Sequence, residues 1–363
     1  MAGLRLRDRD SIVTAEGLIF RVFGYSHPSD AYICDLEYAP SKVFKSDNPK
    51  AFRSNDGKTV FYKFYEDEGW KFIQNSFPQY TIFHEMLQTR VVGVAQSSIA
   101  EVRKPCLELA KLFETKPGDQ LLETMQDALK RTLASSGLLL DDFGVFGSLL
   151  HGFHHPKFSD IDFTIYGLGN VVRLREMLRE LYGKSSSLFR NEFETNASVS
   201  GKCWRFVNYD LGEFVWHQRR KLIYALFKDD RAGRMVKVEF EPVKGWQEIV
   251  NDYDVETRIV RRGWVKLLAR IVGDEDAPFI PSVYAVEPLK VLEGQKSAGE
   301  IVRVVSYLEE FRLQAFKDEV VYVEGNLEEV VSSKGSFFQV VLTYCPRYYE
   351  QVLKVVSNVS SAM

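Results

Sequence analysis

The stretch GVFGSLLHGFHHPKFSDIDFTI, residues 144–165, contains the strongest structural signal of this 363-residue sequence. An apolar segment leads into Gly147 and Ser148, and two leucines follow them. A Gly-Ser pair between a strand and a helix exposes backbone N–H groups and one hydroxyl, which can bind phosphate oxygens. We therefore predict a strand that turns into a helix at Gly147, with Gly147 and Ser148 as phosphate-binding residues.

Two aspartates, Asp160 and Asp162, follow on either side of Ile161. Residues two apart in a strand point to the same face, so both carboxylates should lie on one face while Ile161 and Phe163 face the core. Adjacent carboxylates repel each other unless a cation lies between them. Mg²⁺ prefers hard oxygen ligands together with substrate phosphates. The segment predicts a Mg²⁺ (or Mn²⁺) site, although an Asp-x-Asp taken alone is more often a solvated strand edge.

The ordered pair of motifs is far more specific than either motif alone. Gly147-Ser148, eleven residues and then Asp160-x-Asp162 resembles the signature of the DNA polymerase β-like nucleotidyltransferase superfamily. The resemblance covers roughly residues 105–245 and implies a minimal fold around a mixed sheet. It also implies an enzyme that moves an NMP group from an NTP such as ATP to an acceptor hydroxyl by a two-metal in-line mechanism. Gly147 and Ser148 would be the nucleotide-binding residues, and Asp160 and Asp162 would be catalytic metal ligands.

The resemblance implies a third carboxylate on a later strand. The run from Arg234 to Pro242 alternates, so that Val236, Val238 and Phe240 share one face. Glu239 and Glu241 share the other face. Which of them lies beside the aspartates depends on strand register, which a sequence specifies least securely. We expect Glu239, which has apolar residues on both sides, to be the third catalytic metal ligand, with Glu241 as the alternative.

A basic residue soon after Gly-Ser, common in such proteins, is absent here. Leu149, Leu150 and His151 occupy those positions, so a cation for the triphosphate has to come from elsewhere. The candidates are Lys157 and the cluster at 217–221, which is otherwise a solvated helix end. His151, His154 and His155 resemble a metal cluster, but no cysteine or acid joins them at a usual spacing. We expect a polar loop rim there.

The fold class we expect is α/β (α+β), with three domains. Residues 1–104 would form an N-terminal α/β accessory domain, 105–245 the nucleotidyltransferase catalytic domain, and 246–363 a connector and a β-rich, barrel-like domain. The expected elements are hairpins at 17–38 and 222–240, a strand at 60–65, helices at 107–113, 121–134 and 171–181, five strands between 265 and 342, and a closing helix at 348–356.

Composition excludes several other classes of protein. The 47 basic and 50 acidic residues give a formal charge of −3, so any nucleic-acid contact needs a local basic patch. Candidates for such a patch are Arg219, Arg220, Lys221, Arg258, Arg261, Arg262 and Lys266. The four scattered cysteines predict no disulfide-linked partner. A charged N-terminus and the lack of a long apolar run predict a cytoplasmic protein with no membrane contact.

Two functions from different classes remain open at this point. The first is the nucleotidyltransferase, with an NTP as substrate and RNA or DNA as one candidate acceptor. The second is a catalytically silent nucleotide- or RNA-binding protein. Carboxylates crowded together at a cost in stability favour the first function, and convergence of Asp160, Asp162 and Glu239 would distinguish the two.

Overall fold

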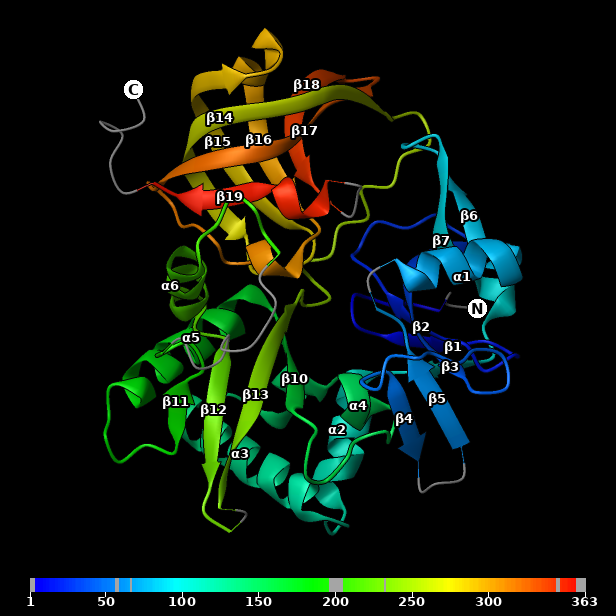
Figure 1. Cartoon of the computed structure of the whole chain (residues 1–363), viewed down its shortest axis with the longest axis vertical. Helices are drawn as coiled ribbons and strands as arrows, with labels where there is room; N and C mark the ends of the chain where they lie inside the picture. The colour runs from blue at the N-terminus through cyan, green and yellow to red at the C-terminus, as the bar shows by residue number, and fades with distance from the viewer. Residues whose placement is uncertain are drawn as a thin grey trace. The chain divides into compact units, whose positions relative to one another are not determined.

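The computed structural model describes residues 4–55, 59–65, 67–195, 205–231, 233–343 and 347–356, and it has the expected α+β architecture (Figure 1). The chain forms two compact units. The first comprises Met1–His84, Thr89–Phe189 and Ala225–Tyr253. The second comprises Glu85–Gln88, Arg190–Tyr224 and Asp254–Met363.

The first unit contains the sheet of the N-terminal region. Its strands run in the order β4-β5-β3-β2-β1-β8, and β7 pairs with both β3 and β6. The predicted hairpin at 17–38 is confirmed, because Arg21 pairs with Asp35 in antiparallel strands. The strands are β1 Ser11–Val13, β2 Ile19–Val22, β3 Ala31–Pro40, β4 Phe52–Asn55, β5 Thr59–Lys63, β6 Thr81–His84, β7 Thr89–Ala95 and β8 Glu101–Arg103; the helical segments are α1 Glu68–Ser76, η1 Pro78–Tyr80 and η2 Gln96–Ser98.

A five-stranded mixed sheet follows, in the order β11-β12-β13-β10-β9. The central strand β10 is antiparallel to β9 and parallel to β13. Its strands are β9 Phe143–Val145, β10 Ile161–Tyr166, β11 Phe189–Asn191, β12 Tyr224–Asp229 and β13 Arg234–Val243. The helical segments are α2 Pro105–Glu114, α3 Gln120–Ser136, η3 Leu140–Asp142, α4 Gly147–Leu150 and α5 Leu168–Tyr182.

The longest helix, α3, shows why these segments fold as predicted. The Asp119 side chain accepts hydrogen bonds from the Leu121 and Leu122 N–H groups at its start, which satisfies donors that a helix leaves unpaired. Gly137 ends the helix with a φ of 68°, a left-handed conformation that glycine adopts without strain. The stripe formed by Leu121, Met125 and Leu129 is fully buried in the core beside β9 and β10.

The second unit is built on strands β14 to β19. The sheet runs in the order β14-β15-β16-β18-β17-β19, and β14 pairs with β17 as well. The strands are β14 Arg258–Asp276, β15 Ser282–Glu293, β16 Ile301–Ser306, β17 Val320–Ser332, β18 Gly335–Leu342 and β19 Val352–Val355; the helical segments are α6 Leu211–Lys221, η5 Lys296–Glu300, η6 Glu309–Phe311 and η7 Tyr348–Glu350.

The expected closing helix needs correction, and one segment of the chain groups differently from the expected domains. The segment expected to be a closing helix is the short η7 followed by β19, which pairs with β17 through Val323 and Leu353. Residues 190–224, expected within the catalytic domain, belong to the second unit. The reason is that Tyr209 donates a hydrogen bond to the Leu353 carbonyl, and the Val355 N–H donates to His217 Nε2 on α6.

The boundary expected at residue 104 also differs from the structure. Residues 1–104 have their own sheet and their own core, which includes Ile12, Phe20 and Val94. They nevertheless share one compact unit with residues 105–189. Among the residues that the structure describes, no helix is both long enough and apolar enough to span a membrane.

Candidate carboxylate site on the mixed sheet

Two of the predicted carboxylates lie side by side in the central pair of strands. In the parallel pairing of β10 and β13, Asp162 is the partner of Glu239, and Thr164 is the partner of Glu241. These residues share one face of the sheet, while Phe163 on the opposite face is fully buried. Asp160 precedes β10 by one residue and is exposed. The sheet therefore brings Asp162 and Glu239 together and leaves Asp160 at the edge of the strand.

The Gly147 turn lies directly against Asp162. Gly147 has a φ of 60°, and a Cβ atom built on it would lie 2.6 Å from Asp162 Oδ2, closer than real Cβ contacts come. The Phe146 N–H donates to the Asp162 carbonyl at 2.8 Å. Ser148 is partly buried, and its carbonyl accepts from the Phe153 N–H at 2.8 Å. The two motifs that the sequence singled out, Gly-Ser and Asp-x-Asp, thus meet at Asp162.

The surroundings of Asp162 disfavour its charge. Burial raises its pKa well above the usual value, and the carboxylates of Glu239, Asp160 and Glu241 raise it further. The charge of Lys63 acts in the opposite direction. A carboxylate in such an environment binds either a proton or a cation.

The two candidates for the third carboxylate have different partners. Glu241 Oε2 accepts from Arg9 Nη2 at 2.8 Å, and both side chains are buried. Glu239 is partly exposed, and its Oε1 lies 2.5 Å from Lys237 Nζ. Glu239 is therefore the carboxylate beside Asp162 that solvent and ligands can reach, whereas Glu241 belongs to a buried ion pair.

The carboxylate oxygens suit a hard divalent cation, but the described residues do not supply a complete set of ligands for it. Among the described residues, no group of three or more His, Cys, Asp or Glu side chains is gathered tightly enough to hold a metal ion. Mg²⁺ is commonly held by one or two carboxylates together with substrate phosphates, and Asp162 with Glu239 provides such a pair. A cation bound there would have to displace Lys237 from Glu239. That Asp160 is a metal ligand stays a prediction.

The N-terminal segment supplies buried charges that sequence reasoning missed. Four consecutive charged side chains, from Arg7 to Asp10, are buried. The Arg7 guanidinium lies 3.6 Å from the centre of the Tyr166 ring, and Arg9 pairs with Glu241. Burial raises the pKa of Asp10 to about 6. Charged residues are usually exposed, so nothing in a local pattern predicts this placement.

The three histidines do not converge on a metal. His151 is buried with its ring 5.3 Å from that of Tyr38, centre to centre, which corrects the expected loop rim at this position. Burial, and then the charge of Arg103, lower the pKa of His151 to about 3. His154 Nε2 lies 2.8 Å from Asp119 Oδ2 at the start of α3.

The basic residues considered for nucleic acid are partly engaged with acids. In the second unit, Arg220 pairs with Glu319, and Lys221 Nζ donates to the Glu310 carbonyl at 2.6 Å. Lys266 Nζ lies 2.9 Å from Glu293, and Arg262 pairs with Glu329. These ion pairs reduce the positive charge that is available for phosphates. Lys157, the other candidate cation for the triphosphate, lies in the first unit and is exposed.

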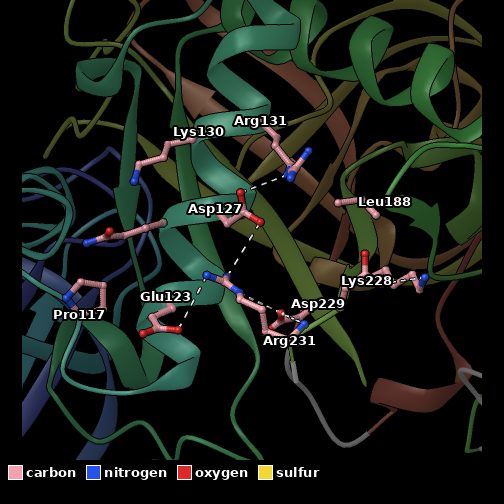
Figure 2. A pocket seen from close by; sticks show the side chains of 11 residues that line it. Pro117, Glu123, Asp127, Lys130, Arg131, Leu188, Lys228, Asp229 and Arg231 are labelled. Carbon is pink, nitrogen blue, oxygen red and sulfur yellow. Dashed lines mark hydrogen bonds and ion pairs between the residues drawn. The ribbon is translucent and has the colours of Figure 1, made fainter. Parts of the chain in front are cut away.

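A separate pocket of about 510 Å³ lies between α3 and the turn that joins β12 to β13 (Figure 2). Arg231 reaches from the turn toward Glu123 at 3.8 Å and Asp127 at 4.0 Å, both on α3. Asp127 also pairs with Arg131 at 3.1 Å. Because its acidic and basic side chains neutralise one another, this pocket shows no preference for a charged ligand.

Comparison with known proteins identifies one curated relative. An uncharacterized protein of Methanocaldococcus jannaschii is 25% identical over 340 residues, which cover 93% of this chain and 94% of the relative. No family model and no solved structure matches the chain. The relative aligns along nearly the whole chain, so the similarity includes both compact units, and its name assigns no activity.

Proposed function

We propose that this protein is a metal-dependent nucleotidyltransferase that moves an NMP group from an NTP to an acceptor hydroxyl. The observation that supports this proposal is the register of β10 and β13, which pairs Asp162 with Glu239 beside the Gly147 turn. The sequence resemblance implies a mixed sheet, a Gly-Ser turn, and a third carboxylate on a later strand beside the strand of the first two.

In this proposal the carboxylates bind the metal, and the Gly147–Ser148 turn binds the phosphates. Asp162 and Glu239, with Asp160 at the strand edge, would hold Mg²⁺ or Mn²⁺. A metal held there would supply charge stabilisation for displacement at the α-phosphorus, in which the acceptor oxygen forms the new P–O bond and pyrophosphate leaves. Backbone N–H groups of the Gly147–Ser148 turn and the Ser148 hydroxyl would orient the phosphates. The raised pKa of Asp162 means that cation binding releases a proton where the free carboxyl is protonated.

A catalytically silent nucleotide- or RNA-binding protein is the second candidate. Two observations favour it. Among the described residues, Asp160, Asp162 and Glu239 do not gather tightly enough to hold a metal ion, and Lys237 already neutralises one of the two paired carboxylates. The two proposals differ in what the carboxylates do. A transferase loses product formation when Asp162 is changed, whereas a binding protein forms no product as the wild type or as the Asp162 variant.

The test is product formation from labelled NTPs. Each α-labelled NTP is incubated with the protein, Mg²⁺ or Mn²⁺, and total RNA, protein or small metabolites as acceptors. We expect covalent transfer of label by the wild type and at least about a hundredfold less by Asp162→Asn. Asp141→Asn, an exposed aspartate of η3, is the matched control and should leave transfer unchanged. Nucleotide binding without transfer to any acceptor class would favour the silent protein.

The salt dependence of acceptor binding tests whether the acceptor is a nucleic acid. Affinity for RNA or DNA falls steeply with salt when lysines and arginines displace counterions from phosphates. We expect a shallow slope, because Arg220, Arg262 and Lys266 are paired with acids. A steep slope would contradict this expectation and support a nucleic acid as the acceptor.

A further inference from the structure

The N-terminal sheet packs onto the segment that follows the Gly147–Ser148 turn. The Tyr38 ring of β3 lies 5.5 Å from that of Phe153, and the Phe61 ring of β5 lies 4.6 Å from it. Phe153 in turn donates its N–H to the Ser148 carbonyl. One face of the β3–β5 pair therefore covers the loop between the Gly147 turn and the Asp160–Asp162 strand.

Lys63 lies on that same face. It is two residues beyond Phe61 on β5 and is the cross-strand partner of Tyr38 on β3. Burial is the main cause of the raised pKa of both Asp162 and Tyr38; the charge of Lys63 opposes the shift at Asp162, and the charge of Asp162 adds to the shift at Tyr38. Lys63 and Tyr38 thus lie on the face of the N-terminal sheet that covers the loop before the Asp160–Asp162 strand.

The Lys63 ammonium is not held in an ion pair by any of the described residues. It is partly buried, and its recorded contact is with the Tyr65 ring, whose centre lies 5.8 Å from Nζ. Among the residues that the structure describes, no carboxylate forms an ion pair with it. By contrast, Lys237 is already bound to Glu239. A partly buried ammonium without a counter-ion is suited to an incoming anion, because the attraction is screened less than at an exposed position.

The Gly147 turn itself has no cation for a polyphosphate. Leu149 and Leu150 follow Ser148, and His151, with a pKa near 3, is neutral at pH 7. Ionised carboxylates near the turn repel an anionic substrate, and a bound metal would neutralise only part of that charge. A compact ammonium with three donors binds phosphate oxygens as a point charge.

We propose that Lys63 of the N-terminal sheet binds the terminal phosphates of the substrate, and so selects nucleoside triphosphates over monophosphates. This inference rests on the proposed function for the identity of the substrate. It gives the N-terminal region a direct role at the site, in place of the basic residue that the sequence lacks after Ser148.

The test compares three ligands by titration calorimetry in Mg²⁺ at pH 7: tripolyphosphate, ATP and AMP. For Lys63→Met we expect affinity for tripolyphosphate and ATP to fall about tenfold or more, the effect of one charged hydrogen bond. Affinity for AMP should change less than about twofold. Lys63→Arg should retain most of the preference, since it keeps the charge. Lys71→Met, an exposed lysine of α1, is the matched control and should bind all three ligands like the wild type.

Each outcome bears on the inference separately from the proposed function. If Lys63→Met binds ATP and tripolyphosphate like the wild type, or weakens AMP equally, the inference is wrong even where the wild type transfers nucleotides. If Lys63 is required for tripolyphosphate binding but no nucleotide transfer occurs, the role of Lys63 in binding polyphosphate is supported and the proposed transferase activity is refuted. A wild type that binds neither ATP nor tripolyphosphate overturns both.

Discussion

Replacing Gly147 by alanine tests the geometry of the site most directly. The new Cβ would lie 2.6 Å from Asp162 Oδ2, where no ordinary contact exists, and φ at this position is 60°. Holding an L-residue in the left-handed region costs about 1–2 kcal/mol. Overpacking a tightly filled position costs about 1–3 kcal/mol more. We therefore expect Gly147→Ala to lower the free energy of unfolding by about 2–5 kcal/mol.

Gly137 provides a matched control for this substitution. It has a φ of 68°, and a Cβ atom built on it meets nothing within 4 Å. Gly137→Ala therefore pays the backbone cost without the contact, about 1–2 kcal/mol. The loss of unfolded-state freedom on changing glycine to alanine is the same at both positions and cancels in the comparison. The difference between the two variants isolates the contact with Asp162.

Urea denaturation of both variants gives the two free energies. The Gly147 variant should be less stable than the Gly137 variant by about 1–3 kcal/mol. Adding Asp162→Ala should recover that difference, because the Asp162 Cβ lies an ordinary 3.9 Å from the new Cβ. Equal stabilities of Gly147→Ala and Gly137→Ala would mean that the turn does not lie against Asp162, and the site as described would be wrong.

Three further predictions concern the carboxylates and the turn. Glu241→Gln should lower the free energy of unfolding by about 1.5–3 kcal/mol, since the buried Arg9 loses one charged hydrogen bond and keeps its ion pair with Asp8 at 3.5 Å; a loss below 1 kcal/mol in urea denaturation would refute the pairing. Asp162→Asn should stabilise the metal-free protein at pH 7, because the raised pKa makes ionisation of Asp162 unfavourable to the folded state. Its advantage should shrink as pH falls to the usual value of 3.8, where both states bind the proton, and a pH-independent difference would contradict this. Ser148→Ala should weaken NTP binding by about 1 kcal/mol in calorimetry, the effect of one hydrogen bond, and unchanged binding would remove the hydroxyl from the site.

The local features of the site could be predicted from the sequence because they depend on short-range rules. Alternation places Ile161 and Phe163 on the core face, and the Gly-Ser pair marks the change from strand to helix. The choice between Glu239 and Glu241 could not be made in this way. Strand register is set by contacts between segments that are some 77 residues apart here, and a shift of two residues preserves every alternation.

Sequence patterns could not predict which residues surround the site, for a different reason. The run from Arg7 to Asp10 consists of four charged residues, which a pattern-based interpretation places in solvent. The charges are buried because Arg9 meets Glu241 and Arg7 stacks on Tyr166, and both partners are more than 150 residues away in the chain. Similarly, α6 leaves the expected catalytic domain because Tyr209 and His217 bond to β19.

The N-terminal sheet is more than an accessory domain in this arrangement. Glu241 would add a third charge to the face that holds Asp162 and Glu239, and Arg9 neutralises it from the N-terminal segment. Lys63 contributes a second positive charge from β5 and has no acidic partner among the described residues. One of these cations is sealed in the interior and the other is partly accessible. The first therefore lowers the electrostatic cost of assembling the carboxylates, and the second is left for a ligand.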